Sequence, residues 1–282
     1  MRFGGIITAM VTPFDADGGL AQDAAAQLIR HLLENGSDGL VLAGTTGEGP
    51  TLSDEEKLAL WEIGVAESGT APVIAGTGSN DTRHTVELTA RAAEVGVDGA
   101  LVVTPYYNRP NRRGVLEHFR ATAEASELPI ILYNIPSRTG VDMPNDLLRE
   151  LAQIPGIAAV KQARAEDCTP VEGLDLLAGN DDMLAGVLDM GGTGGIMVAS
   201  HLVGREMRRM IDEPESRDRI DASLRPLFDV LGVTTNPIPI KAALAMVGHE
   251  VGSLRLPMVD ASEQERAEIR SVLESHGLLE RV

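Results

Sequence analysis

Short apolar runs alternate along the chain with longer segments of helical periodicity. Eight runs rich in Val, Ile and Leu span residues 5–11, 39–43, 73–75, 99–103, 130–133, 157–160, 174–178 and 195–198. Consecutive positions in these runs are apolar, so both faces of each strand are expected to be covered, as in a parallel sheet. The pattern predicts an α/β fold with eight parallel strands.

Helix starts and an internal repeat support the same alternation. Ser53 is followed three positions later by Glu56, the spacing of a capping box, and Asp81 can cap another helix. The segment Gly-Ser-Asp-Gly at residues 36–39 recurs as Gly-Val-Asp-Gly at residues 96–99, each time before an apolar run. Two strand–helix units of about 30 residues would give this separation.

Closure into a barrel is favoured over an open, doubly wound sheet. No early strand leads into a G-x-G-x-x-G turn, and Asp81 stands where the third glycine after Gly76 and Gly78 would fall. We therefore predict a (β/α)8 TIM barrel over residues 1–204. Residues 205–282 are expected to form the last barrel helix and a C-terminal helical appendage packed on the barrel. Between Lys161 and the seventh run there is room for about three helical turns, both loops included, and Pro170 and Gly173 interrupt this segment. The sixth helix is therefore expected to be a single turn or irregular.

Composition excludes several classes of function. The formal net charge is −18 and no basic stripe offsets it, so nucleic acid is not an expected partner. The single cysteine, Cys168, cannot form an internal disulfide, and no Cys/His spacing indicates a zinc site. The first apolar run is too short to span a bilayer and precedes no cleavage motif. We expect a cytoplasmic protein that requires neither metal nor cofactor.

Polar residues that end apolar runs are the candidates for chemistry, because barrel active sites form at the carboxyl ends of the strands. Lys161 follows the sixth run directly. Burial there would lower the pKa of its amine and favour attack on a carbonyl carbon. A lysine at a barrel end can also extend to solvent, so its position alone leaves both readings open.

Two further segments offer polar groups at the same end of the predicted barrel. Thr45 and Thr46 lie in a glycine-flanked loop whose hydroxyls and N–H groups could hold a small carboxylate, although an ordinary turn would also contain such residues. Tyr133 ends the fifth run and could transfer protons; a half-buried aromatic packing role is the alternative.

Five motifs together carry a resemblance to a known family. They are Gly44-Thr45-Thr46-Gly47-Glu48, Val103-Thr104-Pro105-Tyr106-Tyr107-Asn108, Tyr133-Asn134-Ile135-Pro136-Ser137-Arg138-Thr139-Gly140, Val160-Lys161 and Asn236-Pro237-Ile238-Pro239-Ile240-Lys241. In this order and spacing they resemble the dihydrodipicolinate synthase family over nearly the whole chain.

The resemblance implies a reaction and a role for each matching residue. Lys161 would form a Schiff base with pyruvate, and the resulting enamine would attack L-aspartate 4-semialdehyde to give 4-hydroxy-tetrahydrodipicolinate, in lysine and diaminopimelate biosynthesis. Thr45, Tyr133 and Tyr107 would relay protons, with Tyr107 reaching into a neighbouring subunit. Thr45 and Thr46 would bind the pyruvate carboxylate.

The resemblance also implies the remaining site residues and the assembly. Arg138 would receive the carboxylate of the aldehyde substrate, a task suited to a planar guanidinium. Gly179 and Ile196 would line the site, Ile196 through its backbone carbonyl near the lysine. A homotetramer built from two tight dimers is expected.

Other functions remain as alternatives. Related barrels that cleave N-acetylneuraminate or 2-keto-3-deoxy sugar acids share the lysine and tyrosine but lack the Ser-Arg-Thr-Gly segment at residues 137–140. A non-catalytic barrel scaffold is a more distant alternative. Glu166, Asp167 and Cys168 match no family position, and Cys168 lacks a nearby histidine in the sequence to activate it.

The resemblance also covers the positions at which some family members bind lysine as an inhibitor. Lysine-inhibited members bind the effector through two histidines, a glutamate, an asparagine and a tyrosine. Here the matching positions keep Asn80 and Tyr106, but Asp54 and Lys57 replace the histidines and His84 replaces the glutamate. The changed charges predict that L-lysine does not inhibit.

Overall fold

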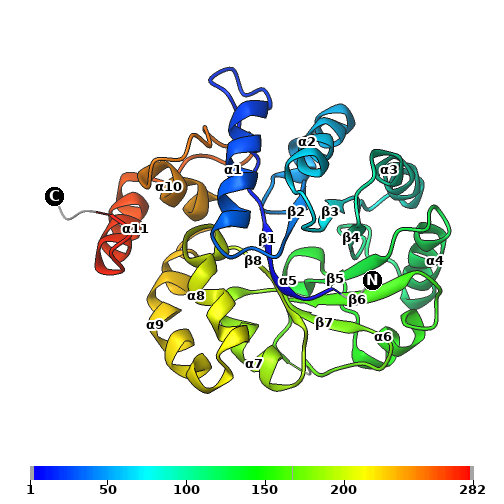
Figure 1. Ribbon diagram of the computed structural model, residues 1–282. Helices are drawn as coiled ribbons and strands as arrows, with labels where there is room; N and C mark the ends of the chain where they lie inside the picture. Colours follow the sequence, from blue (N-terminus) through cyan, green and yellow to red (C-terminus); the bar gives the residue numbers. More distant parts are fainter. Residues whose placement is uncertain (1–2, 167, 280–282) are drawn as a thin grey trace.

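The strands form one closed parallel barrel in sequence order. The computed structural model describes residues 3–166 and 168–279, and Figure 1 shows the strands encircled by helices. The strands are β1 (Gly5–Ala9), β2 (Gly39–Leu42), β3 (Val73–Gly76), β4 (Gly99–Val103), β5 (Ile130–Asn134), β6 (Ile157–Gln162), β7 (Asp175–Ala178) and β8 (Gly194–Met197). The predicted TIM barrel is therefore confirmed.

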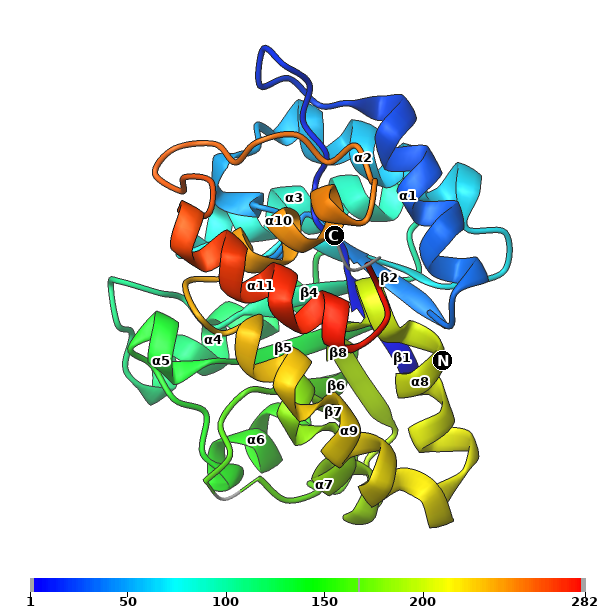
Figure 2. The same ribbon diagram turned by 90° about the vertical axis from the view of Figure 1, so that its left-hand side faces the viewer.

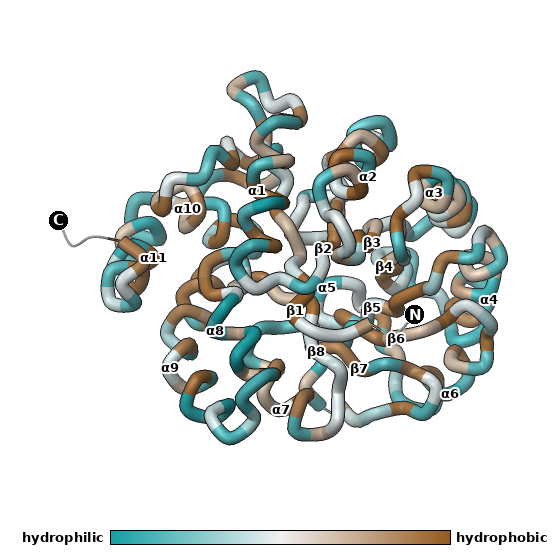
Figure 3. Tube along the Cα trace, viewed as in Figure 1, coloured by the Kyte–Doolittle hydropathy of each residue, from teal (hydrophilic) through white to brown (hydrophobic). Residues whose placement is uncertain are grey.

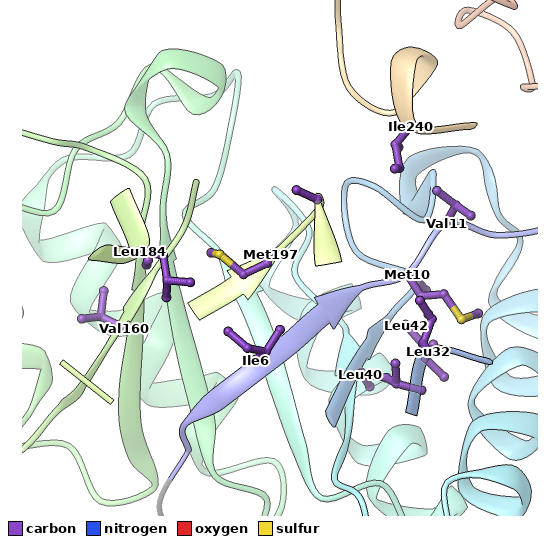
Figure 4. Packing of buried hydrophobic residues seen from close by; sticks show 14 of the residues in the cluster. Ile6, Met10, Val11, Leu32, Leu40, Leu42, Val160, Leu184, Met197 and Ile240 are labelled. Carbon is purple, nitrogen blue, oxygen red and sulfur yellow. The ribbon is translucent and has the colours of Figure 1, made fainter. Parts of the chain in front are cut away.

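Both faces of the strands are buried, as the continuous apolar runs predict. Side chains from alternate positions fill the barrel interior, among them Ile7, Val41, Ile74 and Leu177. The remaining positions pack outward against the helices. Figure 4 shows part of this outer layer.

Barrel closure depends on a close approach between the first and last strands. Gly5 lies opposite Gly194 in the β1–β8 ladder. A Cβ on Gly194 would overlap the carbonyl oxygen of Gly5, and its φ of +149° is one that L side chains rarely adopt. Glycine at this position lets the two backbones meet.

Helices lie between most strands and continue after β8. They are α1 (Gln22–Glu34), α2 (Asp54–Glu67), α3 (Thr82–Val95), α4 (Arg112–Ala123), α5 (Pro136–Thr139), α6 (Asn145–Leu151), α7 (Leu184–Asp189), α8 (Ser200–Asp212), α9 (Arg217–Val230), α10 (Ile238–Met246) and α11 (Glu263–Ser275). The described residues between β6 and β7 form no helix, so the predicted shortening after Lys161 is confirmed. Within the described chain, no helix is long and apolar enough to cross a membrane.

The predicted caps and the repeated Asp-Gly motif have clear local roles. Ser53 forms a capping box with Glu56 at the start of α2. In the repeat, Asp38 accepts a hydrogen bond from the backbone N–H of Ile6 at 2.7 Å, and Asp98 accepts one from Val73 at 2.9 Å. Each carboxylate joins the start of its own strand to the start of the preceding strand.

The C-terminal helices α9, α10 and α11 lie beside the barrel after α8 (Figure 2). The boundary that we expected after residue 204 falls inside α8, the helix that follows β8. Figure 3 shows apolar and polar positions interleaved along these helices, and the buried side chains of α9 and α11 include Leu224, Leu227, Ile269 and Leu273. In α10, Ile240 is fully buried and belongs to the same cluster as Val11 of the segment after β1.

Candidate active site

A cavity of about 360 Å³ opens at the carboxyl ends of the strands. The loops after β2, β5 and β7 contribute to its lining, and β6 contributes Lys161 from within the strand. Of the residues expected from the sequence, six line it: Thr45, Thr46, Tyr133, Arg138, Lys161 and Gly179. Residues separated by more than 130 positions thus meet at one barrel mouth.

Lys161 lies within β6, one residue beyond the apolar run that predicted the strand. Its backbone pairs with Tyr133 of β5 and Leu177 of β7, and the residue is only 5% exposed. Its Nζ lies 4.3 Å from the centre of the Tyr133 ring. Burial lowers the pKa of the amine to about 7; Arg138 adds to this effect, and the carboxylate of Asp181 opposes it. A large fraction of the amine is therefore neutral and nucleophilic near pH 7.

The Tyr133 hydroxyl stays protonated at neutral pH. Burial raises its pKa to about 12, while the charge of Arg138 and a hydrogen bond with the side chain of Thr45 oppose the rise. A neutral phenol beside the lysine can donate a proton and accept one through its hydroxyl partner. The Thr45–Tyr133 contact thus places a second hydroxyl beside the phenol.

The loop after β2 presents unused donors to the cavity. In the described part of the chain, the backbone N–H groups of Thr45 and Thr46 donate to no protein acceptor. Thr46 is 3% exposed, and its hydroxyl accepts a hydrogen bond from Asn236 Nδ2 at 2.9 Å. Two free N–H groups with adjacent hydroxyls suit a carboxylate ligand.

Arg138 belongs to the short helix α5 and stands at the rim of the cavity. Its guanidinium donates to the backbone oxygen of Asn236 at 3.3 Å. Among the described residues, no carboxylate forms an ion pair with it. The remaining donors of the guanidinium are available to an anionic ligand.

Of three further residues expected at the site, Gly179 lines the cavity, and Ile196 and Tyr107 do not. Gly179 lines the cavity, and a Cβ there would lie 2.7 Å from the Gln162 carbonyl oxygen, so glycine permits the close packing of β7 against β6. Ile196 is fully buried among the side chains inside the barrel and is not in the cavity lining. Tyr107 is 90% exposed, has a φ of +71°, and does not line the cavity of its own chain.

The sequence reasoning missed Asp181 as a site residue. Asp181 lines the cavity, and its Oδ1 accepts hydrogen bonds from the N–H groups of Val198 at 2.9 Å and Ala199 at 3.0 Å. Burial raises its pKa to about 6, although these two hydrogen bonds and the charge of Lys161 oppose the rise. The signal was its place three residues after the seventh run, at the end of the barrel where the other polar residues lie.

A second cavity of about 580 Å³ adjoins the first and shares Thr45, Tyr133 and Arg138 in its lining. Asp54, Lys57 and His84 also line it. His84 Nε2 lies 3.0 Å from an Asp54 carboxylate oxygen, and Lys57 Nζ lies 3.5 Å from the other. The Asp54 carboxylate is thus already engaged by groups of the protein.

Cys168 is buried, and burial raises the pKa of its thiol, which disfavours the reactive thiolate. Residue 167, which the sequence also left unassigned, lies outside the described residues. No group of three His, Cys, Asp or Glu side chains in the described chain is arranged to hold a metal ion.

Comparisons with known proteins identify relatives that match nearly the whole chain. A family model described as the dihydrodipicolinate synthetase family matches residues 2–276. A protein of Thermosynechococcus vestitus named 4-hydroxy-tetrahydrodipicolinate synthase is 46% identical, and the match covers 98% of each chain. One of the same name from Moorella thermoacetica is 44% identical, with 99% of this chain and 100% of the other covered.

Solved structures give the same result. The lysine-bound dihydrodipicolinate synthase of Cyanidioschyzon merolae is 41% identical, with a TM-score of 0.95, and the match covers 98% of this chain and 99% of that one. The Acinetobacter baumannii enzyme, solved with pyruvate, is 35% identical, with a TM-score of 0.93 over 98% of this chain and 99% of its own. The chain belongs to the dihydrodipicolinate synthetase family.

Proposed function

We propose that this chain joins pyruvate to L-aspartate 4-semialdehyde through an imine on Lys161 and releases 4-hydroxy-tetrahydrodipicolinate. The chain is a lyase of lysine and diaminopimelate biosynthesis, because its family and its relatives at 44–46% identity carry the synthase activity. The observation that carries the residue-level mechanism is the buried Lys161, whose pKa of about 7 leaves a nucleophilic amine inside the cavity.

The first stage forms the imine. The neutral amine of Lys161 attacks the keto carbon of pyruvate, and the tetrahedral adduct loses water after its hydroxyl is protonated. Tyr133 is the proposed proton donor, and Thr45 passes the proton along. The N–H groups of Thr45 and Thr46 hold the pyruvate carboxylate, which fixes the keto carbon beside the amine.

The second stage forms the carbon–carbon bond. Loss of a methyl proton from the imine gives an enamine, whose carbon attacks the aldehyde of the second substrate. The amino group of that substrate then attacks the imine carbon, which closes the ring and frees Lys161. Arg138 holds the carboxylate of the aldehyde substrate at the rim. In support, its guanidinium lines the cavity, bonds only to a backbone oxygen, and has no carboxylate partner among the described residues.

We also propose that Tyr107 completes the proton relay in a neighbouring subunit of a homotetramer made of two tight dimers. Tyr107 is 90% exposed and has a left-handed backbone, although it is neither glycine nor asparagine. An exposed tyrosine with a constrained backbone is well placed to enter another chain. We further propose that the backbone carbonyl of Ile196 faces the lysine and that the enzyme works in the cytoplasm.

Steady-state assays can separate the proposed function from its alternative. Purified protein should consume pyruvate with L-aspartate 4-semialdehyde and leave N-acetylneuraminate and 2-keto-3-deoxy sugar acids uncleaved. Sedimentation velocity on the same sample should give a tetramer. Turnover of a sugar acid in preference to the semialdehyde would favour the aldolase alternative.

The pH dependence of imine formation tests the environment of Lys161. Because only the neutral amine attacks, the rate at limiting pyruvate should rise with pH to a midpoint near 7 and fall about tenfold per pH unit below it. Asp181→Asn removes a charge that raises this pKa, so the midpoint should move to lower pH. Asp182→Asn, at the exposed neighbour, should leave it in place. A wild-type midpoint above pH 9 would show that Lys161 is not desolvated.

L-Lysine at millimolar concentration should leave activity unchanged. An ammonium group would have to compete with His84 and Lys57 for the Asp54 carboxylate, and Lys57 would repel it. Arg91 also approaches Asp54, at 3.8 Å. The measurement is a steady-state titration with L-lysine at subsaturating pyruvate. Strong saturable inhibition that Asp54→Ala abolishes would contradict the prediction.

A further inference from the structure

Two residues of the recognised motifs have no part in the mechanism above. Glu48 ends the loop after β2, and Lys241 lies in α10, 193 positions later. Their side chains are 2% and 1% exposed, and Lys241 Nζ donates to Glu48 Oε1 at 2.8 Å. This is a buried ion pair outside the cavity lining.

Further contacts satisfy the remaining capacity of both charges. Lys241 Nζ donates to the Ser253 carbonyl oxygen at 3.0 Å and lies 4.2 Å from the centre of the Phe14 ring. Glu48 Oε2 accepts a hydrogen bond from the Arg255 N–H at 2.9 Å. The pair therefore ties the loop after β2 to α10 and to the segment between α10 and α11.

The backbone connects this pair to the proposed carboxylate-binding loop. Glu48 has a left-handed backbone, with a φ of +54°, and its N–H donates to the Thr45 carbonyl oxygen at 3.1 Å. The backbone conformation of Glu48 therefore helps to set the turn that contains Thr45. Asn236, two residues before α10, donates from Nδ2 to the Thr46 hydroxyl at 2.9 Å. The C-terminal appendage thus contacts the loop after β2 at two residues, Glu48 and Thr46.

We propose that the Glu48–Lys241 pair is a positioning device, by which the C-terminal appendage sets the Thr45–Thr46 loop for the pyruvate carboxylate. A buried ion pair is weak evidence for stability, because replacing both partners with well-packed apolar residues is often tolerated. The contacts that join this pair to the loop after β2 point instead to a geometric role. A misplacement of about 1 Å in a positioning group can cost about 10²-fold in rate. The inference rests on the proposed imine with pyruvate.

The test compares three variants: Glu48→Gln, Lys241→Met, and the double variant that removes both charges together. Pyruvate affinity is measured by borohydride trapping over a pyruvate series, and stability by thermal unfolding. We expect the pyruvate concentration for half-maximal trapping to rise about tenfold in the single variants. The double variant should keep this defect even where it recovers thermal stability. The KM for the semialdehyde at saturating pyruvate should change less than about twofold.

A matched control neutralises one partner of an ion pair that lies away from the cavity. Asp38 pairs with Arg208 and lies at the opposite end of β2. Asp38→Asn should lower the unfolding temperature without changing pyruvate affinity. Lys241→Arg, which keeps the charge, should restore part of the affinity lost in Lys241→Met.

The outcomes separate the two proposals. Unchanged pyruvate affinity in folded single variants, or an affinity that recovers together with stability in the double variant, overturns the positioning role. Wild-type protein that traps no pyruvate at all overturns the proposed function instead.

Discussion

Lys161→Ala should abolish the pyruvate adduct and lower turnover by roughly 10⁴-fold or more, because no other group replaces a covalent nucleophile. In wild-type protein, borohydride reduction with pyruvate should add one pyruvate-derived group, located on Lys161 by peptide mass spectrometry. The chain has three lysines, Lys57, Lys161 and Lys241. The adduct therefore has few competing side chains.

Lys57→Met provides the control for this experiment. Lys57 lines the adjoining cavity but not the one that contains Lys161. The variant should form the adduct as wild type does. An adduct on Lys57, or one that survives Lys161→Ala, would exclude the proposed mechanism.

Arg138→Ala should leave the pyruvate imine intact and lower kcat/KM for L-aspartate 4-semialdehyde by about 10²-fold. Losing a charge-assisted partner costs up to about 3 kcal/mol, which corresponds to that factor. The measurement pairs borohydride trapping with initial rates over a semialdehyde series at saturating pyruvate. The two readouts separate binding of the second substrate from formation of the imine.

Two comparisons sharpen the Arg138 experiment. Arg138→Lys keeps the charge but not the planar fork and should recover only part of the rate. Arg109→Ala removes a guanidinium from the neighbouring loop and outside the cavity lining, and should have little effect. Normal semialdehyde turnover by Arg138→Ala would assign selection of the second substrate to another residue.

Periodicity predicted the barrel because each strand is covered on both faces, so each left a continuous apolar run. It predicted the strand ends less well. The β6 ladder continues through Lys161 and Gln162, whose side chains are polar because they serve the barrel mouth rather than the core. Conversely, Met10 and Val11 are apolar but lie beyond β1, and Val11 N donates to His201 Nε2 instead of a strand.

The site also contains residues that the sequence predicts and residues that it does not. Lys161, Tyr133 and Thr45 follow directly from strand ends, and the barrel topology brings them together without further information. Asp181 was missed because its relation to Lys161 depends on how the loop after β7 turns. The Glu48–Lys241 pair joins positions 193 residues apart, a contact that local patterns cannot predict.

The burial of the lysines also bears on how this protein can be handled chemically. Lys57, Lys161 and Lys241 are 9%, 5% and 2% exposed, so arginine supplies nearly all of the accessible positive side chains. Amine-reactive dyes, acylating agents and bifunctional cross-linkers should therefore modify the folded surface sparsely. At neutral pH, a small electrophile that can enter the barrel mouth should acylate Lys161 selectively, because the other two amines are held in ion pairs. A label on the reacting lysine in preference to the other two lysines thus requires no engineered residue.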